Sequence, residues 1–429
     1  MANWAGAVVL GDSNAGTHRP IALTVRDRSR HLLALGSTGC GKSSLIASMV
    51  LADCDAWRGV VLIDPKTDAA RDVADRLDTT ARQRLVLIDP DAAGPVPLLN
   101  LLDPHDPVAV DNLTAVFASI YRRSWGDRIA EAFRMGCQAV IADYHHRVAL
   151  EADKGNHAQT VPIPTLRDVL NLLTKPATRH RIVAALQEGD DDLNADIDAD
   201  LNRDIATYWA AFSNRSEAGQ DRDSAAVLNK LRGLLMRDRF TRQLLTGTGP
   251  PLNMTAVLDG GICLARLPEG LLGADTTSLI GSLLVAKVWQ ATTARARLRE
   301  HQRAPAALYL DEAHRFLHLH TPIDTMLSQA RGYGLGMVLA LQNFAQLGTR
   351  ELREGVSANT LHKLFFRLSP EDATYAERHT YPLLTAHDLS HLDNYVAAAR
   401  LHPDGIDRPA FTLRTRELPA IAHPAGSPV

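Results

Sequence analysis

The sequence predicts an α/β fold with a mainly parallel central sheet and an inserted all-α domain. Short apolar, β-branched runs alternate with helical patterns near both ends of the chain, at the spacing of parallel strand–helix–strand units. Between these regions, from Val108 to about Leu245, apolar residues recur every three or four positions, which is typical of helices. We therefore expect one α/β domain built from residues 1–105 and 250–429, with residues 106–249 forming the all-α insertion.

The α/β domain has strand candidates in both of its parts. In the first part we expect a helix at Leu45–Ala52, and strands at Ile21–Val25, His31–Leu35, Val60–Ile63 and Leu85–Ile88. In the second part the pattern predicts strands at Ile262–Leu267, Ala306–Leu310, Gly336–Leu341 and Leu361–Leu368, and helices at Thr276–Arg299 and Pro322–Gly332.

The insertion is predicted to contain several helices separated by polar breaks. Its clearest helical stretches are Ala130–Tyr144, Thr165–Leu173 and Ala225–Leu235. The polar stretch Glu151–Gln159 and the acidic stretch Glu188–Asp204 are interpreted as solvated connections between helices.

Composition limits the class of protein without choosing a function. Of 429 residues, 45% are hydrophobic and 22% charged, as in ordinary soluble globular proteins. The net charge of -3 gives no overall attraction to nucleic acid, so a DNA partner would need a local basic surface. The four cysteines form no CxxC pair, which argues against a zinc knuckle or a disulfide framework. There is no secretory signal and no apolar run long enough to span a membrane, so we expect a cytoplasmic protein without direct membrane insertion, although a membrane partner remains open.

A phosphate-binding loop is the most specific motif in the sequence. The run GSTGCGKS, Gly36–Ser43, fits G-x-x-x-x-G-K-[ST], and an apolar strand precedes it while a helix follows. The residues expected to surround the phosphates of ATP are Gly36, Ser37, Thr38, Gly39, Cys40, Gly41, Lys42, Ser43 and Ser44. Lys42 would reach the β- and γ-phosphates, and the Ser43 hydroxyl would bind Mg²⁺. The alternative is a glycine- and serine-rich turn that matches the pattern by chance.

A second motif places two acids at the end of a strand. In the run LYLDE, Asp311 is predicted to hold Mg²⁺ and Glu312 to act as the general base that activates water. Paired acids at a strand end also occur as helix caps and surface turns. Together with the phosphate loop, the adjacent Glu312 favours a hydrolase over a kinase.

Five more polar residues are considered for the same site. Gln342 follows the strand Gly336–Leu341 and could report the state of the γ-phosphate, or be an ordinary amide at a strand end. Arg331 and Arg367 could each reach the nucleotide of a neighbouring subunit, or form surface ion pairs. Asp64 could be a second acid at the nucleotide edge, where Lys66 also lies, or stabilise a turn with Pro65.

Taken in order, several stretches of the chain resemble the FtsK/HerA class of P-loop translocases, and among them the conjugative coupling ATPases of type IV secretion (TraD/TraG-like). The stretches that carry the resemblance are RHLLALGSTGCGKSSLI, VVLIDPKTDAARDVADRL, LVLIDPDAAGPVPLLNLLD, SWGDRIAEAFR, AVLNKLRGLLMRDRF, GGICLARLPEGLLGADTTSLIGSLLVAKVWQA, LYLDEAHRF, LSQARGYGLGMVLALQN and LHKLFFRLSPEDA. The phosphate loop occurs in many families, whereas the succession from Asp311 through Arg331 to Gln342 is more specific.

The resemblance implies a RecA-like core that assembles as a homo-hexameric ring around DNA. ATP would bind between subunits, with Arg331 or Arg367 supplied by the neighbour. The all-α domain would recognise DNA or its bound relaxase, and partners in the secretion system could hold the ring at the inner face of the cell membrane. Two features depart from the family: the phosphate loop lies early in the chain, without the preceding transmembrane helices of membrane-bound members, and IDPKTD replaces a more usual glycine-containing version.

Three functional hypotheses remain open at this point. The first is an ATP-driven motor that moves or recruits DNA, or a protein–DNA complex, for conjugation. The second is a soluble HerA-like DNA translocase that works with a nuclease in repair or phage defence. The third is a nucleotide-dependent recruitment switch with slow turnover, against which Glu312 argues, because a switch has less need of a general base.

Overall fold

The computed structural model of the protein describes residues 6–155, 161–188 and 196–421. Within them the chain forms two compact units. The first comprises residues up to Ala92, Asn253–Leu317 and the residues from Thr321 on, and the second comprises Ala93–Leu252 with His318–His320. The first boundary therefore lies about a dozen residues before the position near 105 that the sequence indicated.

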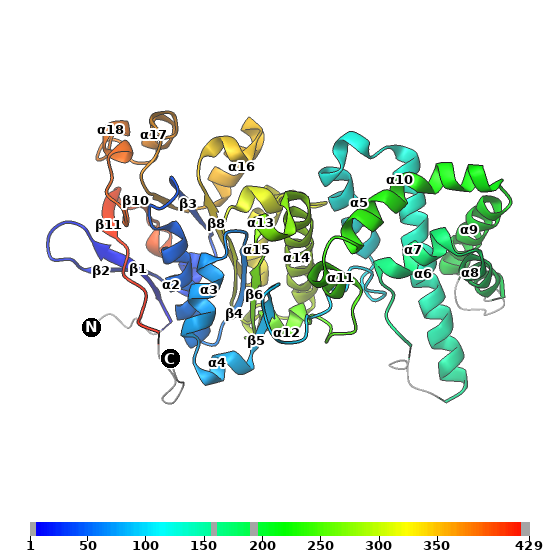
Figure 1. The fold of residues 1–429 in the computed structure, drawn as a ribbon. Helices are drawn as coiled ribbons and strands as arrows, with labels where there is room; N and C mark the ends of the chain where they lie inside the picture. The colour runs from blue at the N-terminus through cyan, green and yellow to red at the C-terminus, as the bar shows by residue number, and fades with distance from the viewer. Residues whose placement is uncertain (1–5, 156–160, 189–195, 422–429) are drawn as a thin grey trace. The chain divides into compact units, whose positions relative to one another are not determined.

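The first unit is built on an eleven-stranded sheet with the order β2-β1-β11-β10-β9-β3-β8-β7-β4-β6-β5 (Figure 1). Its strands are β1 (Val8–Ser13), β2 (Pro20–Leu23), β3 (Leu32–Leu35), β4 (Gly59–Asp64), β5 (Leu85–Ile88), β6 (Ile262–Arg266), β7 (Ala306–Leu310), β8 (Leu335–Leu341), β9 (His362–Phe365), β10 (Val396–Arg400) and β11 (Phe411–Arg414). The seven strands from β9 to β5 pair in parallel, and the remaining pairs are antiparallel. The predicted α/β class with a mainly parallel sheet is confirmed.

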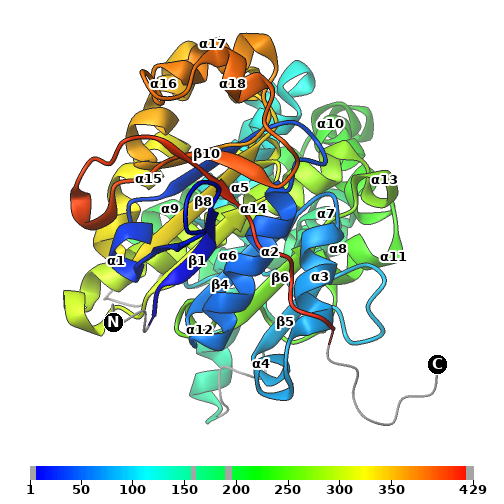
Figure 2. The same cartoon turned by 90° about the vertical axis from the view of Figure 1, so that its left-hand side faces the viewer.

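Helices cover both faces of the parallel part of this sheet. The helices of the first unit are α1 (Val25–Arg28), α2 (Lys42–Asp55), α3 (Asp68–Arg76), α4 (Thr79–Gln83), α12 (Met254–Leu258), α13 (Glu269–Leu272), α14 (Ala274–Ala294), α15 (Ile323–Ala330), α16 (Arg350–Asn359), α17 (Pro370–Glu377) and α18 (Ala386–Ser390). Figures 1 and 2 show α2 and α3 on one face and α12 and α14 on the other. Because both faces are covered, β3, β4, β6, β7 and β8 are buried along their whole length, which explains their continuous apolar sequences.

The second unit is helical in the residues that the structure describes. Its helices are α5 (Ala109–Ile120), α6 (Asp127–Asp153), α7 (Leu166–Thr174), α8 (Pro176–Glu188), α9 (Asp196–Ser213), α10 (Glu217–Leu235) and α11 (Arg239–Thr246). The buried rings of Phe117, Phe133, Trp209 and Phe212 form much of its core.

One predicted break within this unit is wrong. The acidic stretch Glu188–Asp204 was expected to be a solvated connection, but α9 begins at Asp196 and runs through its second half. Aspartates near a helix N-terminus are stabilised by the helix dipole, so acidity here marks a helix start. Residues 189–195 lie outside the described part of the chain, as do 156–159 of the expected break Glu151–Gln159, whose first residues are the end of α6.

No helix among the described residues is long and apolar enough to cross a membrane.

A buried ion-pair network joins α2 to the strands. The Asp53 carboxylate is fully buried and accepts hydrogen bonds from Arg28 at 2.5 and 2.6 Å, from Arg58 at 2.7 Å and from the Tyr309 hydroxyl at 2.6 Å. Removing one partner of such a buried pair leaves the opposite charge without compensation.

Asp53→Asn is therefore expected to lower the free energy of unfolding by about 3–5 kcal/mol, measured by urea denaturation. As a control, Asp72→Asn removes a partly exposed ion pair with Arg76 and should change that free energy by at most about 1 kcal/mol. Equal effects of the two substitutions would show that the Asp53 network does not stabilise the sheet.

Candidate nucleotide-binding site

The phosphate loop connects the carboxyl end of β3 to the first residue of α2. Gly41 precedes the helix with φ of +109°, a conformation that side chains rarely adopt, and a Cβ atom there would lie 2.9 Å from the ring of Tyr395. A Cβ on Gly36 would lie 2.6 Å from Cβ of Phe366. Both glycines are thus required by close packing as well as by the motif, and the loop that the sequence predicts is present.

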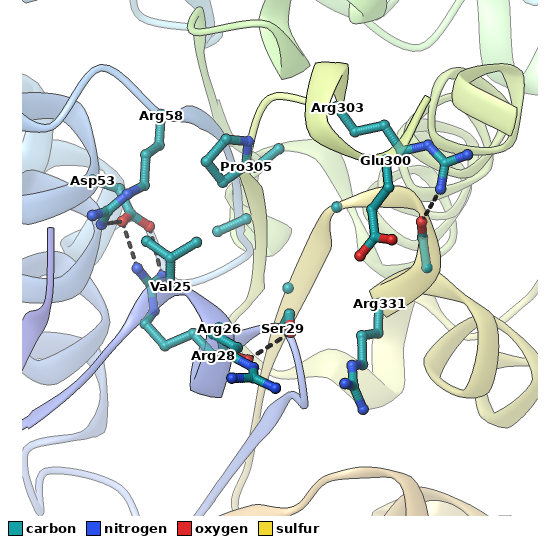
Figure 3. Close-up of a pocket in the computed structure, with 15 residues that line it drawn as sticks. Val25, Arg26, Arg28, Ser29, Asp53, Arg58, Glu300, Arg303, Pro305 and Arg331 are labelled. Atoms are coloured by element: carbon teal, nitrogen blue, oxygen red, sulfur yellow. Dashed lines mark hydrogen bonds and ion pairs between the residues drawn. The ribbon is translucent and has the colours of Figure 1, made fainter. Parts of the chain in front are cut away.

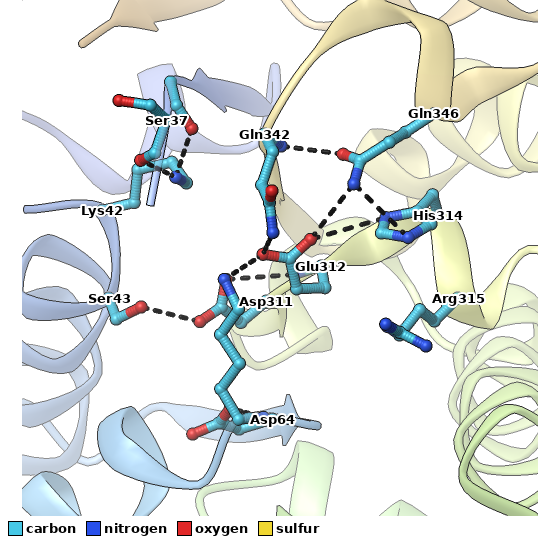
Figure 4. Close-up of polar contacts among 12 residues, drawn as sticks. Ser37, Lys42, Ser43, Asp64, Asp311, Glu312, His314, Arg315, Gln342 and Gln346 are labelled. Atoms are coloured by element: carbon cyan, nitrogen blue, oxygen red, sulfur yellow. Dashed lines mark hydrogen bonds and ion pairs between the residues drawn. The ribbon is translucent and has the colours of Figure 1, made fainter. Parts of the chain in front are cut away.

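The side chain of Lys42 folds back onto the phosphate loop. Its side chain is buried, and its ammonium group donates hydrogen bonds to the carbonyl oxygens of Gly36 and, at 2.8 Å, of Ser37 (Figure 4). Burial lowers the pKa of Lys42. An ammonium held at the concave side of the loop, next to the N-terminus of α2, is suited to bind a phosphate oxygen.

Ser43 and Asp311 meet although 268 positions separate them in the sequence. The Ser43 hydroxyl donates a 2.8 Å hydrogen bond to Asp311 Oδ2, and Asp311 follows the last residue of β7 and is fully buried. Burial raises the pKa of Asp311, an effect that the Ser43 hydrogen bond opposes. A hydroxyl and a carboxylate oxygen this close are the ligand types that a small hard cation such as Mg²⁺ prefers, so the pair fits the predicted metal position.

Glu312 is held in a left-handed backbone conformation with φ of +51°, and its carboxylate is almost completely buried. Oε1 forms an ion pair with Lys66 and accepts a 2.8 Å hydrogen bond from Gln342 Nε2. Gln346 and His314 lie 3.5 and 3.6 Å from Oε2 (Figure 4). Burial raises the pKa of Glu312, but the hydrogen bonds from Lys66 and Gln342 outweigh it and keep the pKa below its usual value. The carboxylate is thus ionised at neutral pH, as a general base must be.

Asp64 stabilises a turn. Its carboxylate accepts hydrogen bonds from the backbone N–H groups of Lys66 at 2.8 Å, Thr67 at 2.9 Å and Ala70 at 3.0 Å, at the start of α3. Burial and the nearby charge of Asp311 raise the pKa of Asp64 to about 6. Of the two roles that the sequence left open, these contacts match the turn.

The two candidate arginines lie at different edges of the sheet. Arg367 follows β9, and its carbonyl oxygen accepts a 3.0 Å hydrogen bond from Ser37 in the phosphate loop, so its exposed side chain lies beside the loop of its own subunit. Arg331 begins the short helix η7 (Arg331–Tyr333), just before the amino end of β8. It lines a pocket with Arg26, Glu300 and Arg303 (Figure 3), away from the carboxyl ends where the phosphate loop lies.

The structure adds contacts that the sequence does not indicate. Lys66 was expected near the nucleotide edge, but not as the partner of Glu312. Gln346 also reaches the backbone N–H of Gln342, through a 2.8 Å hydrogen bond to its Oε1. The only sequence signal for these contacts is position: Lys66 follows β4 and Gln346 follows β8, so both lie at the same edge of the sheet as Glu312.

Among the described residues no group of three or more histidines, cysteines or acids could hold a metal ion by itself.

The sheet, with a phosphate loop and an acidic strand end along one edge, defines a RecA-like P-loop domain with a helical insertion.

No protein-family model matches the sequence, and no curated protein matches it. Solved structures do match over nearly the whole chain. The plasmid coupling protein TrwB bound to the GTP analogue GDPNP has a TM-score of 0.62 at 17% identity, covering 94% of this chain and 90% of that one.

Two further solved structures share this fold. TrwB bound to ADP and Mg²⁺ has a TM-score of 0.60 at 15% identity over 98% of this chain and 97% of that one. VirB4 of Thermoanaerobacter pseudethanolicus has a TM-score of 0.59 at 14% identity over 96% of this chain and 97% of that one. The fold is therefore shared with the coupling protein TrwB, in agreement with the resemblance to coupling ATPases, and also with VirB4, which the motifs did not indicate.

Proposed function

We propose that this protein is a Mg²⁺-dependent ATPase of type IV secretion that moves or recruits DNA, or a protein–DNA complex, during conjugation. The observation that carries the proposal is the meeting of Lys42, Ser43, Asp311 and Glu312 at one edge of a sheet that matches TrwB and VirB4. TrwB has been solved with GDPNP, ADPNP, and ADP with Mg²⁺, which supports a nucleoside triphosphate as the substrate here.

Each residue of the site has a distinct role in this proposal. Ser43 and Asp311 would hold Mg²⁺, which supplies charge neutralisation at the phosphate oxygens when bound. Lys42 exchanges its bonds to the loop carbonyls for bonds to phosphate oxygens. Glu312 accepts a proton from the attacking water, and Gln342 orients that carboxylate through its 2.8 Å hydrogen bond. This arrangement makes the site hydrolytic rather than only nucleotide-binding.

The proposal extends to assembly and partners. A homo-hexameric ring would place Arg331 of one subunit at the nucleotide of the next, and DNA would be gripped through its backbone without sequence specificity. The all-α unit would recognise DNA or its relaxase, in the cytoplasm at the inner face of the membrane.

ATP hydrolysis measured with and without DNA tests the function. We expect DNA to stimulate hydrolysis at low salt, and the stimulation to fall as salt rises, because backbone contacts release counterions. Hydrolysis that DNA leaves unchanged at every salt concentration would contradict the DNA-moving role and favour the recruitment switch. If DNA stimulates hydrolysis only when a nuclease partner is present, the HerA-like alternative is favoured.

Lys66 gives a prediction about pH. Its ion pair helps to keep the pKa of Glu312 below its usual value, so the base loses its activity only when pH falls through that lowered pKa. In Lys66→Met the burial of Glu312 is no longer opposed by this charge, so the pKa of Glu312 rises and the acid limb of the kcat profile should move to higher pH. Lys66→Arg should restore the limb, and Lys175→Met, an exposed lysine in the second unit, should leave it in place. An unmoved limb in Lys66→Met would show that this ion pair does not control the base.

A further inference from the structure

The residues along the nucleotide-binding edge of the sheet indicate how a bound nucleotide is oriented there. In the order β10-β9-β3-β8-β7-β4, the phosphate loop follows β3. Gln342, Glu312 and Lys66 follow β8, β7 and β4, so they all lie on one side of the loop. A nucleoside triphosphate is an extended molecule with its γ-phosphate at one end and its base at the other. With the γ-phosphate next to Glu312, the base extends toward the opposite side of the loop, where β9 ends and β10 begins.

Tyr395 occupies that opposite side. It immediately precedes β10, which runs antiparallel to β9, so the residue lies at the same edge as the phosphate loop. Its backbone N–H donates a 2.9 Å hydrogen bond to the carbonyl oxygen of Cys40, and its carbonyl accepts a 2.8 Å hydrogen bond from the N–H of Thr415. The first bond holds the residue against the loop, and the second joins it to the residue after β11.

The conformation and exposure of Tyr395 are unusual for an aromatic residue. Its φ is +65°, a strained region for a bulky side chain, and the residue is 47% exposed. Its ring approaches Gly41 so closely that only glycine fits there. Core packing does not explain a residue with a strained backbone and a half-exposed ring next to the phosphate loop. Backbone strain of this kind is concentrated at functional sites.

We propose that Tyr395 forms the nucleobase subsite, with its ring stacking on the base of the nucleotide that the phosphate loop holds. The inference rests on the proposed nucleotide-binding function and adds the residue that binds the base. Every base has a π-face, so this contact serves purines of both kinds and contributes affinity rather than discrimination between adenine and guanine. Arg367, an exposed residue that follows β9, lies on the same side of the loop, where its carbonyl oxygen accepts a hydrogen bond from Ser37.

The test compares two ligands, one with a base and one without. In Tyr395→Asn the ring is lost while asparagine tolerates the left-handed backbone, so the loop should keep its shape. We expect the Kd for ADP to rise about 5–150-fold, the range for losing one stacking aromatic, with the Kd for inorganic tripolyphosphate unchanged. Tyr395→Phe should bind both ligands like the wild type. Tyr381→Ala, which removes an exposed tyrosine that follows α17, is the matched control and should change neither Kd.

The outcomes separate the base subsite from the function on which it rests. An equal loss of ADP and tripolyphosphate affinity in Tyr395→Asn would mean that Tyr395 only supports the loop, and unchanged affinity for both would mean that it does not touch the base. Either result overturns the inference and leaves the ATPase proposal standing. A wild-type protein that binds neither ligand would overturn the proposed function and the subsite together.

Discussion

Glu312→Gln is expected to lower kcat for ATP hydrolysis by about 10²–10⁴-fold, the range for loss of a general base, while the Kd for ATP changes by less than about threefold. Glutamine has the shape of glutamate but cannot accept a proton from water. Lys42 and Ser43, the proposed ligands of the phosphates and of Mg²⁺, remain intact, so binding and chemistry should separate. Single-turnover hydrolysis and equilibrium binding of the same preparation measure the two quantities.

A matched substitution controls for the loss of a carboxylate elsewhere. Glu371→Gln changes an exposed acid at the start of α17 and should leave both kcat and Kd as in the wild type. If Glu312→Gln keeps wild-type kcat, another group activates the water. If it loses ATP binding as well, Glu312 shapes the site rather than acting as its base.

The parts of the site that the sequence predicted are those encoded by neighbouring residues. A phosphate loop needs its glycines, lysine and serine in one continuous turn, so Gly36–Ser43 can be recognised from its spacing alone. The acids Asp311 and Glu312 are adjacent and follow an apolar run, so the second motif can also be recognised in the sequence. The contact between Ser43 and Asp311 followed from combining these two motifs.

Contacts that depend on the order of strands were not predictable in the same way. Lys66 and Glu312 are 246 residues apart, and they meet because β4 and β7 are neighbours in the sheet. The strand β10, VAAAR, contains three alanines and little β-branched character, so local propensity does not indicate a strand. Pairing with β9 and β11 makes it one, and this in turn brings Tyr395 to the phosphate loop.

Arg331→Ala is expected to reduce kcat by about 10³-fold or more, the range for an arginine supplied to a phosphoryl-transfer site. Arg331 precedes the amino end of β8, whereas Gln342 and the phosphate loop lie at the carboxyl ends. The seven residues of β8 span roughly 23 Å at 3.3 Å per residue, so the side chain cannot reach the nucleotide of its own subunit. Its exposed position beside Arg26 and Arg303 suits a neighbour's triphosphate instead. Steady-state kcat of the purified protein measures the loss.

Mixing two inactive variants decides between action within a subunit and action across subunits. Lys42→Ala removes a group that must act on the subunit's own nucleotide, and Arg331→Ala removes the one assigned to the neighbour's. In randomly mixed head-to-tail rings, about a quarter of the interfaces combine an intact Lys42 with an intact Arg331 from the next subunit, so activity should return to roughly that fraction. If the subunits are proven to exchange and ATPase activity does not recover, Arg331 acts on the nucleotide of its own subunit. The distance along β8 argues against that outcome, because the sheet itself separates Arg331 from the loop that follows β3.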